Sequence, residues 1–78
     1  MSESIAQKLS WEIQAQNDRG EATARQRLAL EIVYGVALTL DDQPELFSAV
    51  IASIIEQVSD PEMQRLLRLY MRRGLKAS

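Results

Sequence analysis

The chain has 78 residues, of which 9 are basic and 11 acidic, and it contains neither cysteine nor histidine. This composition excludes disulfides, thiolate chemistry, zinc sites built on Cys or His, and an imidazole general base. The length predicts a single domain spanning residues 1–78, because so short a chain has no room for a second hydrophobic core.

The charges are unevenly distributed along the chain. Residues 1–60 carry ten acidic and four basic side chains, whereas residues 61–78 carry five basic and one acidic. The first twenty residues are charged and have no apolar signal segment. The most apolar stretch, residues 28–40, is shorter than the about 20 residues that a membrane span needs. We therefore expect a cytoplasmic protein with no membrane segment.

The first predicted helix covers about residues 4–16. Ile5, Leu9 and Ile13 recur at helical spacing and form one narrow apolar stripe, while Trp11 lies on the opposite side. Residues 17–20 supply a break. Asp18 and Glu21 have the spacing of a capping box, which predicts that the next helix begins at Asp18.

The second predicted helix runs from residue 20 or 21 to about residue 40. Its second half is apolar on nearly every side, and only Glu31, Gly35 and Thr39 leave a polar window. A helix that is apolar all round must be surrounded, so this helix is predicted to be the central element. A buried Glu31 would be a candidate catalytic acid, but the window favours an exposed Glu31 paired with Arg27 one turn earlier.

Two proline-containing turns open the third and fourth predicted helices, which end near residues 58 and 74. In the first turn Asp42 is the predicted N-cap, with Pro44 and Glu45 in the first helical turn; residues 59–62 repeat this chemistry. Short connections favour antiparallel neighbours. The sequence thus predicts an all-α fold, a small antiparallel four-helix bundle or three packed helices with a projecting or swapped fourth. Because the core is small, we expect dimerisation to complete it.

Trp11 and the third helix supply the candidate dimer interface. Trp is enriched at interface hot spots, so Trp11 is a candidate for dimer and partner contacts; the alternative is a half-buried Trp lying across a neighbouring helix. Small side chains on the third helix could allow a second helix to approach closely, or could simply be solvent-exposed helix formers. These are Ser48, Ala49, Ala52 and Ser53.

The fourth helix carries a predicted row of cations on the side opposite its apolar residues. Guanidinium groups pair with carboxylates and phosphates through two parallel hydrogen bonds, which makes this row the candidate partner-binding surface. The structural alternative is that the cations favour the helix dipole and keep an exposed face hydrated. The members of the row are Arg65, Arg68, Arg72 and Lys76, with Arg73 beside them.

No motif for catalysis, cofactor binding or metal binding is present in the sequence. The three glycines are isolated, and no nucleophile is paired with a base. Asp41 and Asp42 are explained by the turn that they form. We therefore expect no enzyme, no cofactor and no metal. The sequence predicts a non-catalytic interaction module, a small adaptor, inhibitor or regulator that homodimerises and binds an acidic protein partner. The alternative is a small nucleic-acid-binding regulator that uses the basic C-terminal helix.

Overall fold

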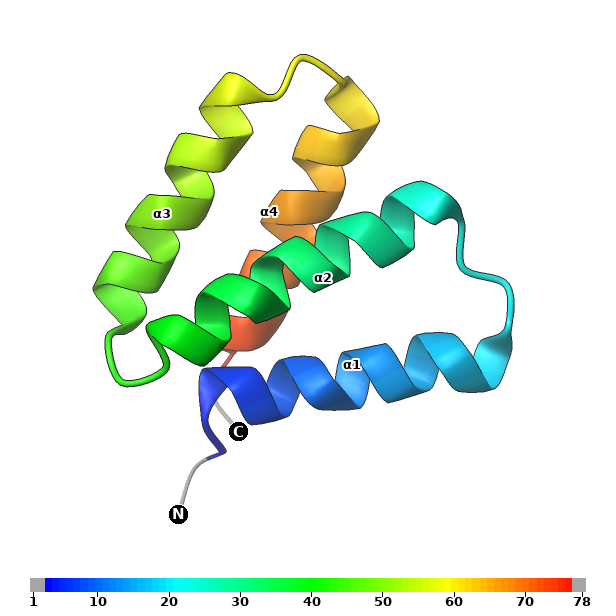
Figure 1. Cartoon of the computed structure of the whole chain (residues 1–78), viewed down its shortest axis with the longest axis horizontal. Helices are drawn as coiled ribbons and strands as arrows, with labels where there is room; N and C mark the ends of the chain where they lie inside the picture. Colours follow the sequence, from blue (N-terminus) through cyan, green and yellow to red (C-terminus); the bar gives the residue numbers. More distant parts are fainter. Residues whose placement is uncertain (1–2, 77–78) are drawn as a thin grey trace.

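The computed structural model describes residues 3–76, which form four α-helices and no strand (Figure 1). This confirms the predicted all-α class and the number of helices. The helices are α1 (Ile5–Arg19), α2 (Ala24–Thr39), α3 (Pro44–Gln57) and α4 (Pro61–Leu75).

The four helices form two hairpins that cross each other. α1 and α2 reverse direction across one connection, and α3 and α4 reverse across another, while α4 passes behind α2 in Figure 1. The most extensive contact joins α2 to α4, and both of these helices also contact α1 and α3. α2 therefore shares the central position with α4, which packs against its own chain and does not project. The molecule is flat, with extents of 33 × 30 × 18 Å.

One hydrophobic core lies between the two hairpins. Each helix contributes residues spaced three and four apart, as expected for amphipathic helices that bury one side. The contribution of α1 is small, because its stripe supplies only Ile5 and Leu9 as buried apolar side chains. The other buried hydrophobic residues are Ala29, Leu30, Val33, Ala37, Phe47, Ile51, Ile55, Met63, Leu66, Leu67 and Tyr70.

The beginning of α2 differs from the prediction. α1 continues to Arg19 and ends at Gly20, whose φ of 67° is the left-handed conformation that favours glycine at a helix C-cap. Asp18 therefore lies inside α1 and cannot start the next helix. The N-cap of α2 is Thr23, whose hydroxyl accepts from the amide of Gln26 while the Gln26 side chain accepts from the amide of Thr23.

The proline turns start α3 and α4 where expected, but the predicted N-cap of α3 is wrong. Pro44 and Pro61 each occupy the first helical turn, as their fixed φ and missing N–H allow. The N-cap of α3 is Gln43 and not Asp42, and it makes no side-chain capping bond. The N-cap of α4 is Asp60, whose carboxylate pairs with Arg25 of α2 in place of capping its own helix.

Candidate interaction surfaces

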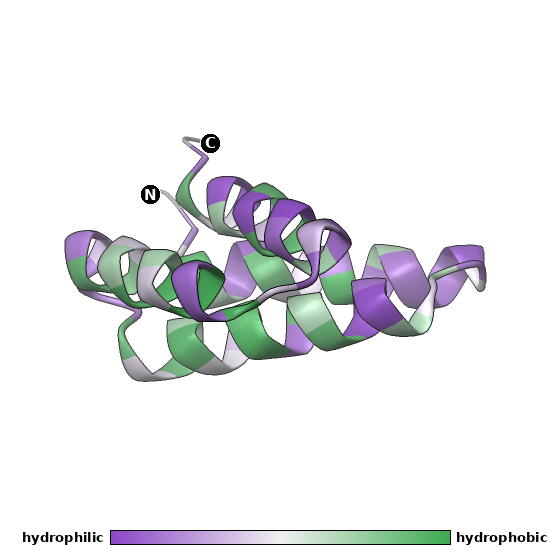
Figure 2. Ribbon diagram, turned by 90° about the horizontal axis from the view of Figure 1, so that it is seen from above, coloured by the Kyte–Doolittle hydropathy of each residue, from purple (hydrophilic) through white to green (hydrophobic). Residues whose placement is uncertain are grey.

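The outer side of α4 carries the basic row that the sequence predicts. Arg65, Arg68 and Arg72 are exposed, on the side opposite the buried Leu66, Leu67 and Tyr70. Figure 2, seen from above, shows hydrophilic positions on the outer side of α4 and mainly hydrophobic positions along α2 at the opposite edge. The basic row and the apolar part of the surface therefore face away from each other.

Two of the arginines are already paired with acids of this chain. Arg65 Nη2 lies 2.6 Å from Glu62 Oε1 on the same helix, and Arg73 Nη1 lies 2.8 Å from Glu12 Oε2 on α1. Lys76 follows the end of α4 as its C-cap, and its carbonyl oxygen accepts from Lys8 Nζ. Within residues 3–76, Arg68 and Arg72 form no ion pair. Among the arginines of the predicted row, Arg68 and Arg72 are thus the two guanidinium groups without an ion pair between described residues, and the contact of Lys76 uses its carbonyl oxygen and not its ammonium group.

Hydrogen bonding within the ion pairs shifts the ionisation of their members. The Arg65 guanidinium lowers the pKa of Glu62 below that of an ordinary glutamate, chiefly by its hydrogen bonds, and the pKa of Arg65 is raised in return. Arg25 Nε lies 2.7 Å from Asp60 Oδ2 and lowers the pKa of Asp60 in the same way, while the pKa of Arg25 is raised. This second pair joins α2 to the start of α4.

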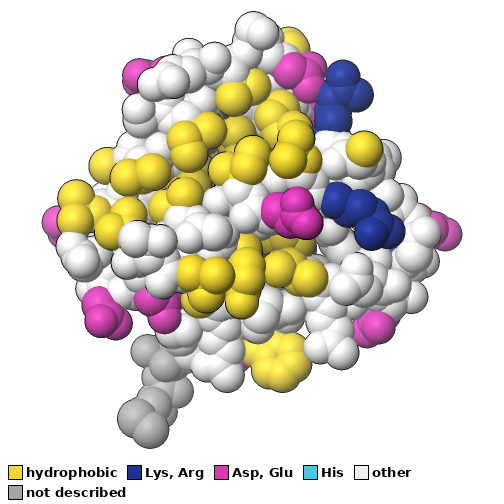
Figure 3. All heavy atoms as spheres, in the orientation of Figure 1, with side chains coloured by type: hydrophobic (Ala, Val, Ile, Leu, Met, Phe, Trp, Pro, Cys, Tyr) yellow, Lys and Arg dark blue, Asp and Glu magenta, His cyan; other side chains and the backbone are white. Residues whose placement is uncertain are grey.

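Hydrophobic side chains are exposed over α2 and α3. Leu28 and Leu38 of α2 are 50% and 60% exposed, and Leu46 and Val50 of α3 are 50% and 37% exposed. We call these four residues the apolar face; Figure 3 shows hydrophobic side chains spread over α2 and α3 in this view. The prediction that α2 is surrounded is wrong, because the other three helices pack against one side of it. Its opposite side is left to solvent.

Glu31 and Arg27 lie on the exposed side of α2. The exposure of Glu31 confirms that it occupies the polar window and is no buried acid. The predicted pair with Arg27 is wrong, since the ion pairs between described residues involve other side chains.

The two predicted dimer-interface features lie at different places on the surface. Trp11 is 56% exposed, and its indole N–H donates to the carboxylate of Glu3, so no neighbouring helix covers it within the chain. On α3, the hydroxyl of Ser48 donates to Met71 Sδ at 3.8 Å and so faces α4. Ala49, Ala52 and Ser53 are exposed. The small side chains therefore do not form one continuous free face.

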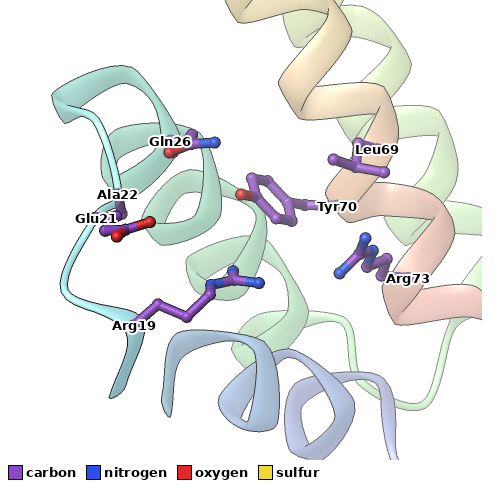
Figure 4. Close-up of a pocket in the computed structure, with 7 residues that line it drawn as sticks. All are labelled: Arg19, Glu21, Ala22, Gln26, Leu69, Tyr70 and Arg73. Atoms are coloured by element: carbon purple, nitrogen blue, oxygen red, sulfur yellow. The ribbon is translucent and has the colours of Figure 1, made fainter. Parts of the chain in front are cut away.

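A small polar pocket lies between the end of α1, the start of α2 and α4. Its volume is about 280 Å³, and Figure 4 shows Arg19 of α1 and Arg73 of α4 extending toward it beside Tyr70. Pockets for small ligands are usually larger and mainly apolar. Arg73 is already neutralised by Glu12, which leaves Arg19 as the cation free of an ion pair among the described lining residues. This pocket therefore has the character of a polar surface indentation.

A buried hydrogen bond to Tyr70, one of the residues that line this pocket, was missed by sequence reasoning. Gln16 Nε2 donates to Tyr70 Oη at 2.7 Å and links α1 to α4 inside the core. Gln16 continues the helical spacing of Ile5, Leu9 and Ile13, and this position in an apolar stripe was the signal that could have identified it. No buried side-chain nitrogen or oxygen of the described residues lacks a hydrogen-bond partner.

Two further polar side chains, those of Asp41 and Gln64, contact backbone groups of another helix or its end, and these contacts were also missed. Asp41 Oδ1 accepts from the amide of Ala6 at 2.9 Å, so the turn before α3 supplies an acceptor to the start of α1. Gln64 Nε2 donates to the carbonyl oxygens of Ile55 and Val58 at 3.2 and 2.6 Å. It thereby satisfies groups at the end of α3. Both residues have structural roles that no local pattern indicates.

Comparison with known proteins finds no match: no family model, curated protein or solved structure matches this chain. Among residues 3–76, no three His, Cys, Asp or Glu side chains are grouped so that they could hold a metal ion. No helix within this range has the length and apolar character required to cross a membrane.

Proposed function

We propose that this protein is a non-catalytic interaction module that homodimerises and binds an acidic surface of a partner protein through the outer side of α4. The observation that carries the proposal is the contrast between the arginines of this helix. Arg65 and Arg73 are paired with acids, whereas Arg68 and Arg72 are exposed, one turn apart and free of any ion pair among the described residues. A pair of guanidinium groups at this spacing fits carboxylates on a facing surface.

The layout of the remaining surface supports a protein partner over a nucleic acid. A duplex is bound by many cations, each facing a phosphate. Here only two arginines of α4 are free of an ion pair among the described residues, on a molecule whose charged side chains in residues 1–60 are predominantly acidic. The small size and the exposed helix faces support the proposal of an adaptor, inhibitor or regulator. The cytoplasmic location stays a prediction from the sequence.

The test compares matched charge variants as bait in a quantitative pull-down. Arg68→Gln/Arg72→Gln removes two positive charges from the outer side of α4, and Lys8→Gln/Arg19→Gln removes two from α1. We expect the first variant to lose a subset of the proteins that the wild type retains, because charge-assisted hydrogen bonds are removed. The control should retain that subset. If the wild type and Arg68→Gln/Arg72→Gln recover the same proteins in equal amounts, the proposal that the outer side of α4 binds a partner protein is wrong.

Binding to a mixed-sequence duplex, followed by fluorescence anisotropy, tests the nucleic-acid alternative. Binding through phosphates weakens steeply between 50 and 200 mM salt. We expect little binding even at the lower concentration. Strong salt-dependent binding to the duplex that requires Arg68 and Arg72 would contradict the proposal of an acidic protein partner and favour a nucleic acid as the partner.

A further inference from the structure

The exposed side of α2 has the spacing of a helix-pairing seam. Ala24, Leu28, Glu31, Gly35 and Leu38 are all exposed and follow one another at intervals of four, three, four and three. This alternation is the seam by which two helices pack side by side. We infer that the apolar face is the contact between two copies of this chain, in which the two α2 helices pack antiparallel along this seam. The inference rests on the homodimer of the proposed function and gives it a surface and a register.

Gly35 supports a close helix contact at this place. It lies in the interior of α2, and a Cβ added to it would meet no atom within 4 Å. A helical glycine is about 1 kcal/mol less favourable than alanine. Packing within the chain offers no compensation for this, since the space beside Gly35 is open. A second helix crossing the seam would approach most closely where the side chain is absent.

The charge on the seam favours the antiparallel orientation. In a parallel pair, Glu31 would face the partner's Glu31, and like charges would meet in an apolar contact. In the antiparallel pair centred between positions 31 and 35, Leu28 faces the partner's Leu38. Glu31 then faces the partner's Gly35, where the missing side chain leaves room for its carboxylate. The exposed leucines at both ends of the seam are thereby covered.

The broad side of the molecule is large enough for this contact. A specific interface buries about 800 Å² on each partner, and the two longest extents of the chain are 33 and 30 Å. Leu46 and Val50 of α3 extend the apolar face beyond the seam. Because α4 lies on the far side from the outer surface of α2 (Figure 2), pairing through α2 leaves two sets of Arg68 and Arg72 exposed on the dimer.

Light scattering coupled to size exclusion, over a range of protein concentrations, tests the surface. Leu28→Gln/Leu38→Gln should raise the dimer dissociation constant at least roughly tenfold, since apolar area is lost from both copies. Both side chains are largely exposed, so helicity should be unchanged. Trp11→Gln is the matched control, because it removes an exposed aromatic side chain on α1 and should leave the dimer intact.

The outcomes separate this inference from the proposed function. A dimer that survives Leu28→Gln/Leu38→Gln but is lost in Trp11→Gln would overturn the surface while leaving a homodimer. A wild type that is monomeric at every concentration would overturn both the surface and the homodimer. Neither result affects binding through Arg68 and Arg72, which the pull-down measures separately.

Disulfide trapping tests the register, because the chain has no cysteine of its own. Leu28→Cys and Leu38→Cys proteins, mixed and oxidised, should form a covalent heterodimer. Each variant alone should not, since its two cysteines would lie about 15 Å apart along the seam, beyond the reach of a disulfide. Covalent dimers from each variant alone, with none specific to the mixture, would overturn the antiparallel arrangement.

Discussion

Single polar side chains join helices of this protein that are far apart in the sequence. The hydrogen bond from Gln16 to Tyr70 is buried, and the only other acceptor near the Gln16 amide among described residues is the carbonyl of Gln26 at 3.5 Å. In contrast, the pair between Arg25 and Asp60 lies at the surface, with side chains 60% and 38% exposed. The buried hydrogen bond between Gln16 and Tyr70 therefore contributes more to stability than the exposed ion pair between Arg25 and Asp60.

Tyr70→Phe should lower the free energy of unfolding by about 1–3 kcal/mol, because it leaves a buried amide donor without its close partner. Urea denaturation followed by circular dichroism measures the change. Tyr34→Phe is the control, since Tyr34 is only half-buried and none of the hydrogen bonds between described residues involves its hydroxyl. Equal free energies for the two variants would show that the bond to Gln16 adds nothing to stability.

The pair between Arg25 and Asp60 should make stability depend on pH in the acidic range. The pKa of Asp60 is lowered in the folded chain, so the pair stabilises the fold above the about 3.9 of an unperturbed aspartate and is lost as pH falls through the lowered value. Asp60→Asn should therefore have a lower Tm than wild type at neutral pH, and the difference should shrink toward pH 2. A difference independent of pH would contradict this account.

At the scale of the elements, two glycines in helices have opposite surroundings. Gly35 of α2 faces open space, whereas a Cβ on Gly74 of α4 would lie 3.0 Å from Ile5 Cγ2 and 3.3 Å from Leu9 Cδ1. Gly74 is thus the point at which α1 crosses α4. The narrow stripe of α1 reaches the core because α4 has no side chain at this position.

Alanine substitution of the two glycines should distinguish the effect of helix propensity on the free energy of unfolding from the effect of packing. Gly35→Ala should raise the free energy of unfolding of dilute, monomeric protein by about 0.5–1 kcal/mol. The free energy of unfolding of the Gly74→Ala protein should be about 1–3 kcal/mol lower than that of the Gly35→Ala protein, because the added methyl group overpacks the contact with Ile5 and Leu9. Thermal or urea unfolding measures both. Similar values would mean that α1 shifts to accept the methyl group at little cost.

At the scale of the whole molecule, the flat shape limits how much apolar surface the chain can bury alone. With an extent of only 18 Å in its thinnest direction, the fold has a single core between two crossed hairpins. Leu28, Leu38, Leu46 and Val50 are left outside this core. An exposed set of large hydrophobic side chains on a small domain favours association.

A dimer through the apolar face should make thermal stability depend on protein concentration, because association stabilises only the folded state. The Tm of the wild type should rise by about 3–5 °C for each tenfold increase in concentration. At concentrations below its raised dissociation constant, the Leu28→Gln/Leu38→Gln protein should show no such rise. Differential scanning calorimetry over a hundredfold range makes the comparison, and a concentration-independent wild-type Tm would contradict the dimer.

The helices and their approximate limits are determined by local sequence. Apolar residues at helical spacing, Pro44 and Pro61 in first turns and Gly20 after α1 act within a few residues of where they stand, so the all-α class follows from the sequence alone. The exposed position of Arg68 and Arg72 follows in the same way from the side of α4 on which they lie.

Only the tertiary structure decides which exposed groups are available and which apolar sides are covered. Arg73 is taken by Glu12, sixty-one residues earlier, and Asp60 pairs with Arg25 instead of capping α4. The sequence pattern of α2, which is apolar on nearly every side, predicts a helix that is buried all round. The three other helices of the described part of the chain do not cover all of its sides. Its outer side stays open because the other three helices all pack on the side that carries Ala29, Leu30, Val33 and Ala37.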